Sequence, residues 1–310
     1  MKPKVTYEQF KAVMSKRPTV AQLIERYELE NGARIGRSQS YTFGMLKRSP
    51  TVGERQAHEM TAMDVVEHVR RRLRDGAKPQ TCKQDVTYLR VVFRDAEMLW
   101  EIPGVTLHTL AKAHVTLTKQ GLICSSQRRT QRPTPEQQQA LLSYFRAEDP
   151  RCETKMAIVY EFQLASGRRI SETCRITRGG VNLEKRTCEV RDLKNSKGKG
   201  FHGTFPLLGR AWEIVLERLA VIPDHPGARL FPFNEKTCGH RHTDAKKALG
   251  FGDLRMHDAR RERFSGMLEA GYSVAQVQQV SLHTDANILL KNYVTTDAAA
   301  VHAGPVGTAR

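Results

Sequence analysis

The chain has 310 residues and a mass of 35.1 kDa, a length typical of two domains. Fifty Lys and Arg against 33 Asp and Glu leave a formal net charge of +17, with an isoelectric point near 9.8. A globular protein this basic attracts polyanions, which favours nucleic acid as the ligand over the alternatives of an ordinary basic enzyme or a ribosome-associated protein.

Neither the N-terminal segment nor any later one is typical of a membrane protein. The opening sequence MKPKVTYEQFKAVMSKRP contains no apolar core of a signal peptide, and no apolar run approaches the roughly 18 residues that cross a bilayer. The basic residues are spread along the chain rather than gathered on one short amphipathic helix, which argues against binding to a membrane surface. We therefore expect a soluble protein of the cytoplasm, with no membrane partner.

The first third of the chain has the pattern of a small helical domain. Apolar residues recur at helical spacing over 20–27, 65–73 and 86–96. Thr61 or Asp64 is suited to cap the second of these helices, which should end at Asp75 and Gly76. The third should begin after Pro79. Short helices joined by short connections predict an all-α domain over 1–117.

A basic segment over 118–135, TKQGLICSSQRRTQRPTP, interrupts the helical pattern. It contains two prolines and no acidic residue. This composition is typical of an extended linker, and its basic side chains suit contact with a phosphate backbone. A merely solvated linker is an equally good interpretation. The candidate DNA-binding residues here are Lys119, Arg128, Arg129 and Arg132.

The remainder of the chain predicts helices around one small antiparallel sheet. Helical patterns cover 136–145 and 154–165, and then the pattern changes to short strands over 181–193 with a turn at 184–186. The lysine-rich segment 194–200 is typical of a hairpin loop, followed by a return strand over 201–207. Helices fill the rest. The expected fold class is therefore mainly α with a small antiparallel β-sheet, an α+β arrangement.

The cysteines and histidines do not form a recognisable metal site. None of the six cysteines belongs to a CxxC pair, so we expect reduced thiols. Cys238, His240 and His242 lie close together but lack a second ligand pair at zinc-site spacing. We interpret them as the polar start of a helix that runs to Leu249, and we expect no metal and no other cofactor.

Four separated segments hold the residues that could carry chemistry. They are GRRISE over 167–172, the lysine-rich hairpin, HDAR over 257–260, and the stretch from His283 to Tyr293. Each has an ordinary structural interpretation on its own. An arginine can lie on the surface, lysines at a hairpin tip are usually solvated, a histidine can cap a helix or pack in a core, and a tyrosine can pack a terminal helix.

Taken together, the order and spacing of these segments resemble the tyrosine recombinase (phage integrase) family, which includes the Xer proteins and Cre. The resemblance rests on six residues of the second half: Arg169, Lys194, His257, Arg260, His283 and Tyr293. In the first half, 61–64, 76–81 and 89–100 are similar to the family's helical core-binding domain. The resemblance implies a core-binding (SAM-like) DNA-binding domain over 1–117, a basic linker over 118–135 and a catalytic domain over 136–296. The tail over 297–310 would be disordered or dock on a neighbouring subunit.

The resemblance also implies a reaction. Two guanidiniums, Arg169 and Arg260, would hold the scissile phosphate in fixed geometry, and Tyr293 would attack it as the covalent nucleophile. Lys194 would protonate the leaving 5′ oxygen as general acid. His257 and His283 would hydrogen-bond the phosphate and help to move protons. The product is a 3′-phosphotyrosyl link, which keeps the bond energy, so that resealing needs neither ATP nor metal.

Several positions depart from the family pattern. The usual Leu-Gly-His is Ser281-Leu282-His283 here, His283 and Tyr293 are ten positions apart, and Leu290 stands where threonine is common. Arg168 precedes Arg169 where an apolar residue is usual. Lys197 is the alternative to Lys194, and Lys197 and Lys199 are further candidates for DNA contact. Glu172 is expected to support the arginines through a buried ion pair, although a carboxylate on a helix surface is nearly as plausible.

By resemblance, the expected function is site-specific cleavage and rejoining of double-stranded DNA, by a homotetramer on paired sites. A phage or another mobile element of bacteria is the expected source, with accessory DNA-bending or directionality factors as further partners. Two alternatives stay open. One is a non-catalytic DNA-binding or architectural protein on a recombinase scaffold, which the altered SLH turn favours. The other is a type IB topoisomerase-like enzyme, which shares these residues.

Overall fold

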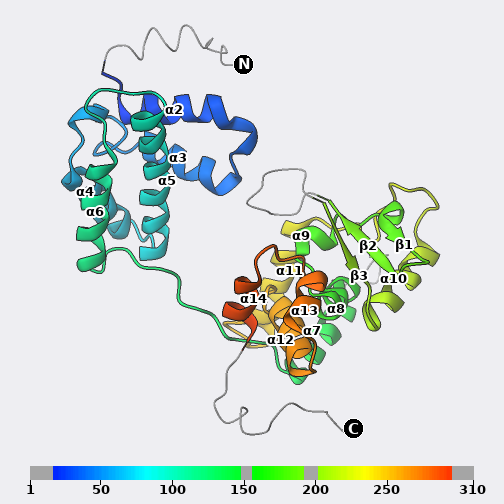
Figure 1. Cartoon of the computed structure of the whole chain (residues 1–310). Helices are drawn as coiled ribbons and strands as arrows, with labels where there is room; N and C mark the ends of the chain where they lie inside the picture. Colours follow the sequence, from blue (N-terminus) through cyan, green and yellow to red (C-terminus); the bar gives the residue numbers. More distant parts are fainter. Residues whose placement is uncertain (1–16, 148–155, 192–201, 295–310) are drawn as a thin grey trace, which may run out of the picture. The chain divides into compact units, whose positions relative to one another are not determined.

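The computed structural model describes residues 17–147, 156–191 and 202–294. The chain divides into two compact units, residues 1–127 and 128–310 (Figure 1). This division falls inside the segment predicted as a linker. The predicted linker is partly structured, however, because Leu122 and Ile123 pack against the core of the first unit. Among the described residues, no helix has the combination of length and hydropathy that crossing a membrane requires.

The first unit is entirely helical in the part that the structure describes. Threonine capping boxes begin two of its helices: Thr19 and Thr61 each accept a hydrogen bond from the backbone of the residue three positions later, whose side chain bonds back. Pro79 begins a third, where proline costs no hydrogen bond. The helices are α2 (Val20–Asn31), α3 (Arg37–Lys47), α4 (Ala62–Arg74), α5 (Pro79–Met98) and α6 (Leu107–Lys119), with 3-10 turns at Gly32–Arg34 and Ala57–Glu59.

A buried polar network connects the helices of the first unit. Ser49 Oγ lies 2.9 Å from His68 Nδ1, and His68 Nε2 lies 3.4 Å from an Asp85 oxygen that also accepts from Arg72. A serine, a histidine and an aspartate in this order are the components of a hydrolytic triad. Here Ser49 is 0% exposed and its oxygen also accepts from Arg71. A substrate has no access to Ser49, so the network is structural.

The second unit places a three-stranded sheet beside a group of helices. Its elements are α7 (Pro135–Arg146), α8 (Met156–Ser166), α9 (Ile170–Thr173), a 3-10 turn (Arg178–Gly180), β1 (Val181–Asn182), β2 (Thr187–Val190), β3 (Gly203–Pro206), α10 (Arg210–Val221), α11 (Glu235–Ala248), α12 (Asp258–Glu269), α13 (Val274–Ser281) and α14 (Ala286–Tyr293).

The sheet has the antiparallel order β1-β2-β3, and Val190 pairs with Gly203 beside the loop that joins the last two strands. That loop contains the lysine-rich segment, and residues 192–201 lie outside the described part of the chain. The predicted fold class, mainly α with a small antiparallel sheet, is confirmed.

The core of the second unit brings distant segments together. Helix α8 packs against α7, α10 and α12, and the rings of Phe162 and Phe231 lie 4.7 Å apart inside this core. Helices α12, α13 and α14 pack against one another (Figure 1), around a separate apolar cluster that includes Phe264, Val277 and Leu289. Tyr293, at the end of α14, belongs to this cluster. The packing therefore anchors the predicted nucleophile on α12.

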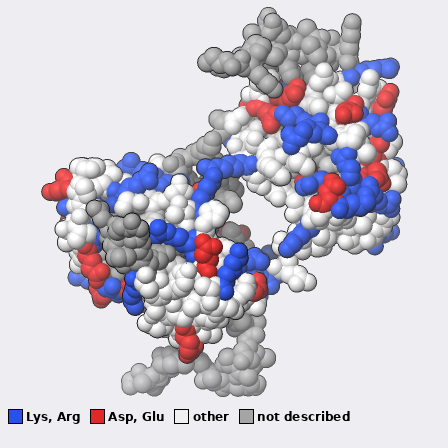
Figure 2. Space-filling view, turned by 180° about the vertical axis from the view of Figure 1, so that it is seen from behind, with Lys and Arg blue, Asp and Glu red and all other residues white. Residues whose placement is uncertain are grey.

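Basic residues are distributed over both units rather than confined to one. In the face shown in Figure 2, Lys and Arg are scattered over both units, with Asp and Glu among them. The chain as a whole has an excess of basic over acidic residues, with a net charge of +17. A field of this kind attracts a long polyanion from many directions, and the site itself must provide the specific contacts.

Candidate active site

Arg260 is the residue at which the predicted catalytic segments meet. Arg260 lies in the first turn of α12 and is 2% exposed. Its Nη1 donates to the carbonyl of Gly167 at 2.8 Å, and its Nη2 donates to the carbonyl of Ser281 at 2.9 Å. The same Nη2 lies 3.2 Å from His283 Nε2. One guanidinium thus binds both the GRRISE segment and the SLH turn.

Gly167 is required by this packing. Its φ of +68° is in the left-handed region, and a Cβ at this position would come within 2.6 Å of the Phe264 ring. Phe264 in turn lies under Arg260, with the guanidinium carbon 4.7 Å from the ring centroid. The glycine of GRRISE therefore lets its own carbonyl approach Arg260.

Arg169 and Glu172 form the second part of the site. Arg169 Nη1 donates to Glu172 Oε1 at 2.6 Å, and the Arg169 side chain is still 29% exposed. Glu172 is only 1% exposed, and its other oxygen lies 3.9 Å from Arg260 Nη1. Burial acts to raise the pKa of Glu172, but the charges of Arg168, Arg260 and Arg169 outweigh it and hold the pKa below its usual value. Glu172 is thus an ionised, buried partner of the arginines.

The two adjacent arginines of GRRISE have different surroundings. Arg168 is fully buried and donates to the carbonyl of Val280, whereas the Arg169 side chain is partly exposed. Of these two neighbours, Arg169 is the one whose guanidinium reaches solvent, whereas the Nη2 of Arg168 is bound to the carbonyl of Val280. The geometry therefore favours Arg169 as the arginine of this segment that contacts the phosphate, in agreement with the resemblance to the family.

His283 is held by hydrogen bonds on both ring nitrogens. Its Nδ1 lies 2.7 Å from Ser281 Oγ, and its Nε2 faces Arg260. Ser281 Oγ donates to the Gln278 carbonyl, which leaves it to accept from Nδ1–H, so Nε2 carries the lone pair toward Arg260. Burial, followed by the charge of Arg260, lowers the pKa of His283 to about 3. In the absence of DNA, neutral His283 therefore orients Arg260.

Tyr293 faces the same group. Tyr293 is 6% exposed, and the centroid of its ring lies 5.7 Å from that of His283. The ring of Phe264 packs against it edge-on, with the centroids 5.4 Å apart. The pKa of Arg260 is lowered by burial and by the charge of Arg169, but the charge of Tyr293 and a side-chain hydrogen bond with Tyr293 act in the opposite direction. The ring of Tyr293 thus lies against His283 and Phe264, which both contact Arg260, despite the extra residue after His283.

His257 lies immediately before α12 and is exposed to solvent. Partial removal of its ring from water, followed by the positive charges of Arg260 and Arg169, lowers its pKa to about 4. His257 is the exposed residue at the start of α12, three positions before Arg260. The structure therefore brings together six of the sequence-predicted residues: Arg169, Glu172, His257, Arg260, His283 and Tyr293. Lys194, Lys197 and Lys199 lie outside the described residues.

The linker arginines bind carboxylates of the protein itself. Arg129 forms a bidentate pair with Asp258, at 2.7 Å for the shortest contact, and also contacts Asp253. Arg132 pairs with Glu262 and Glu269. Of the other candidates, Lys119 is exposed, and exposed Arg128 donates to the carbonyl of Val294, directly after Tyr293. Arg129 and Arg132 are thus anchored to α12 and the loop before it, a contact that the acid-free linker sequence does not reveal.

Sequence reasoning also missed three side chains that support the site. Ser281 orients His283, Phe264 packs under both Arg260 and Tyr293, and Asp258 connects α12 to the linker. For Ser281, its position two residues before the histidine is a usable signal. The roles of Phe264 and Asp258 depend on long-range packing and carry no local signal.

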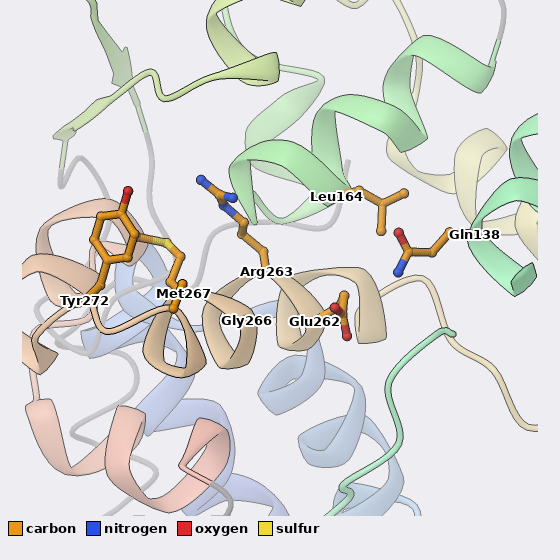
Figure 3. Close-up of a pocket in the computed structure, with 8 residues that line it drawn as sticks. Gln138, Leu164, Glu262, Arg263, Gly266, Met267 and Tyr272 are labelled. Atoms are coloured by element: carbon orange, nitrogen blue, oxygen red, sulfur yellow. The ribbon is translucent and has the colours of Figure 1, made fainter. Parts of the chain in front are cut away.

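A pocket on the second unit lies apart from these residues. It has a volume of about 320 Å³ and lies between α12 and the helices α7 and α8, with Arg263, Met267 and Tyr272 lining one end (Figure 3). Leu164 and Gln138 line its other end. None of the six residues described above is part of its lining, so the pocket is not the candidate active site.

The described residues contain no group of three or more His, Cys, Asp and Glu placed to bind a metal ion. Cys238, His240 and His242 lie along α11, which ends at Ala248, one residue before the predicted end at Leu249. His242 is 3% exposed and packs beside the ring of Tyr160. Burial lowers the pKa of His242 to about 4, so it is a neutral core histidine.

Comparison with known proteins identifies the family. The chain is 25% identical over 285 residues to a Haemophilus influenzae protein whose name places it among integrases and recombinases, covering 90% of this chain and 87% of that one. The Tn1549 transposon integrase, solved with a circular intermediate DNA, superposes with a TM-score of 0.70 at 18% identity, over 92% of this chain and 98% of that one. A lambda integrase tetramer bound to a Holliday junction gives a TM-score of 0.66 at 16% identity, over 96% and 84%.

These structural likenesses show the shared fold. The model of the phage integrase family itself matches residues 131–299, more than half of the chain. This chain therefore belongs to the phage integrase family, the tyrosine recombinases.

Proposed function

We propose that this protein is a site-specific DNA recombinase that cleaves and rejoins strands through a covalent 3′-phosphotyrosyl link at Tyr293. Family membership supports an enzyme that breaks and rejoins DNA. The observation that carries the specific proposal is the position of Arg260, which contacts Gly167, Ser281 and His283, while the ring of Tyr293 packs beside that of His283.

The proposed step is an in-line displacement at phosphorus. The Tyr293 oxygen forms a bond to phosphorus, and the bond from phosphorus to the 5′ oxygen breaks. Arg169 and Arg260 hold the non-bridging oxygens, where negative charge increases in the transition state. Lys194, or Lys197 as the alternative, gives a proton to the leaving 5′ oxygen. Reversal by the 5′ hydroxyl of another strand completes the exchange without ATP or metal.

The histidines are the candidate proton carriers on the nucleophile side. The charges of Arg260 and Arg169 are among the causes that depress the pKa values of His257 and His283. A bound phosphate offsets those charges, so both pKa values should rise when DNA occupies the site. His257, on the open side, is then suited to accept the proton of the Tyr293 phenol.

The proposed partner is double-stranded DNA, bound by a homotetramer on paired sites. The relatives solved with DNA and the tetrameric lambda integrase support this assignment. In the proposed arrangement, residues 1–117 are the core-binding domain, 118–135 the linker and 136–296 the catalytic domain. The tail over 297–310 lies outside the described residues. We place the protein in the cytoplasm, with a mobile element as its source and accessory DNA-bending or directionality factors as further partners.

Covalent trapping tests this function. Random-sequence duplexes are first selected for binding to the full chain, and the selected sequences are then rebuilt with nicks so that the cleaved end diffuses away. An SDS-resistant protein–DNA band is expected with the wild type. Binding without any such band would support a purely architectural protein, and relaxation of plasmids that lack the selected sequence would support a topoisomerase. The SLH turn does not itself favour the architectural alternative, because His283 still reaches Arg260.

A further inference from the structure

The turn that presents His283 has a backbone conformation that favours glycine, yet it contains leucine. Leu282 has φ 57° and ψ 32°, the left-handed conformation, at the end of α13. A Cβ in this region crowds the neighbouring carbonyl, and for that reason helices that end in this way commonly have glycine at this position. Leu282 persists in the conformation only if surrounding contacts hold it there.

Side chains from three segments of the chain supply those contacts: the loop between α8 and α9, helix α12, and helix α13 itself. Arg168 Nη2 donates to the carbonyl of Val280, and Arg260 Nη2 donates to the carbonyl of Ser281. Gln278 Nε2 donates to the carbonyl of His283 at 2.9 Å. Carbonyls on both sides of Leu282 are therefore fixed by side-chain donors. Arg260 already belongs to the predicted catalytic set, but nothing in that set accounts for Arg168.

Arg168 has surroundings that are costly for a cation. Its side chain is 0% exposed, and its guanidinium lies 4.4 Å over the ring of Phe205 in β3. Glu172 is 3.6 Å away, and within the described residues Nε and Nη1 of Arg168 have no hydrogen-bond partner. Burial and the like charge of Arg260 lower its pKa to about 9. A methionine would fill this space without a buried charge, so packing alone does not explain an arginine.

We propose that Arg168 is a positioning residue for the reaction: it holds the left-handed turn at Leu282 and thereby keeps His283 in contact with Arg260. Its hydrogen bond to Val280 does the work that a glycine at position 282 would otherwise do. The inference rests on the proposed function for its catalytic readout only. Its structural part, the link between Arg168, the turn and the His283–Arg260 contact, concerns the protein without DNA. The same guanidinium also contacts Phe205 in β3 and Glu172, the ion-pair partner of Arg169.

A double-mutant cycle tests whether Arg168 compensates for the absence of glycine at position 282. Arg168→Met removes the donor to Val280, and Leu282→Gly removes the conformational strain that makes the donor necessary. We expect Arg168→Met to slow covalent trapping by tenfold or more, with DNA affinity changed less than twofold. Leu282→Gly alone should change trapping less than twofold. The double variant should recover to within about threefold of the wild type, since glycine adopts the turn without help.

A matched control separates this effect from general loss of stability. Arg218 on α10 is also buried and also donates to a backbone carbonyl, that of Leu230 at 2.8 Å. Leu282→Gly should not rescue Arg218→Met. If Leu282→Gly fails to improve Arg168→Met, or improves Arg218→Met equally, the positioning role is wrong. Should Arg168→Met not fold, Arg168→Lys with and without Leu282→Gly takes its place. The same rescue is then expected, and its absence would again exclude the positioning role.

Nitrogen NMR of the histidine side chains gives a readout without DNA. In the wild type, His283 should be the neutral tautomer with Nε2 accepting from Arg260. Arg168→Met should shift the Nε2 resonance, because His283 leaves Arg260, and Leu282→Gly should restore the wild-type position of that resonance. An unshifted Nε2 resonance in Arg168→Met would overturn the inference. If the wild type shows the resonance but traps no DNA, the proposed function fails and the role of Arg168 in the turn is decided by NMR alone.

Discussion

The Nη2 atom of Arg260 lies 3.2 Å from Nε2 of His283, although Arg260 is in α12 and His283 is 23 positions later, in the turn after α13. The contact exists because α12 packs against α13, and because the SLH turn directs the imidazole back toward α12. It places a neutral acceptor against a buried guanidinium, and the ring of Tyr293 lies 5.7 Å beyond the imidazole. Three of the residues proposed for catalysis are thus in one cluster before DNA binds.

Replacement of Arg260 by lysine should abolish the arrangement while keeping the charge. The guanidinium donates to two carbonyls and faces His283 at the same time, and a lysine ammonium does not reproduce that planar geometry. We expect covalent trapping under single-turnover conditions to fall at least 100-fold, about 3 kcal/mol of transition-state stabilisation. Arg210→Lys, on the exposed start of α10, is the control and should remain near wild type. Trapping within threefold of wild type in Arg260→Lys would contradict the assignment.

Stability should fall on acidification below neutral pH because of the buried histidines. The folded-state pKa of His242 is lowered by burial to about 4, whereas an unfolded histidine titrates near 6.5. Between these values the unfolded chain binds more protons, so the free energy of unfolding rises with pH across this window and is lost as pH falls through it. Each such histidine contributes at most about 1.4 kcal/mol per pH unit.

Urea denaturation at pH 7, 6 and 5 measures this slope. His242→Gln should flatten the dependence on pH, whereas substitution of exposed His108 by Gln should leave it unchanged. An identical slope in His242→Gln and the wild type would show that His242 takes up its proton in the folded state near the normal pKa.

Arg129 should act on stability rather than on DNA affinity. Its partner Asp258 is 1% exposed, so Arg129→Met leaves a buried carboxylate with Arg261, at 3.3 Å, as its remaining cationic partner. Breaking a buried pair typically costs about 3–5 kcal/mol, and the effect here should be smaller because the backbone N–H of Arg255 still donates to Asp258. Urea denaturation and the salt dependence of DNA binding, measured side by side, distinguish the roles. Unchanged stability with a reduced salt slope would show instead that Arg129 contacts phosphate.

In contrast to Arg129, Lys119 should act on DNA affinity rather than on stability. It is exposed at the end of α6, in the segment predicted to follow the DNA backbone. If it neutralises one phosphate, Lys119→Ala should reduce the slope of log K against log salt by about one, with stability unchanged. A slope equal to that of the wild type would remove Lys119 from the DNA interface.

Much of the fold follows from local sequence signals. The capping threonines and Pro79 mark where helices begin, and the strand pattern after residue 181 correctly places the antiparallel sheet. These features depend on neighbours a few residues apart, so a single sequence reveals them. The partial structure of the predicted linker was missed, because the packing of Ile123 on the first unit is a tertiary contact.

The candidate site was predictable as a set of residues but not as a geometry. Order and spacing point to Arg169, Arg260 and Tyr293 through resemblance to the family, whereas burial of Arg168 and the pairing of Arg129 with Asp258 join positions more than 100 residues apart. No periodicity or local motif encodes such contacts. The lysine that would act as general acid stays a prediction, because residues 192–201 lie outside the described part of the chain.

Peptide mapping of the trapped covalent complex tests the central claim most directly. After nuclease and protease digestion, mass spectrometry should find the residual nucleotide on the peptide that contains Tyr293, and Tyr293→Phe should give no adduct. The exposed Tyr272, in the connection between α12 and α13, is the internal comparison. A nucleotide on Tyr272 or any other residue, or an adduct that persists in Tyr293→Phe, would contradict strand exchange through Tyr293.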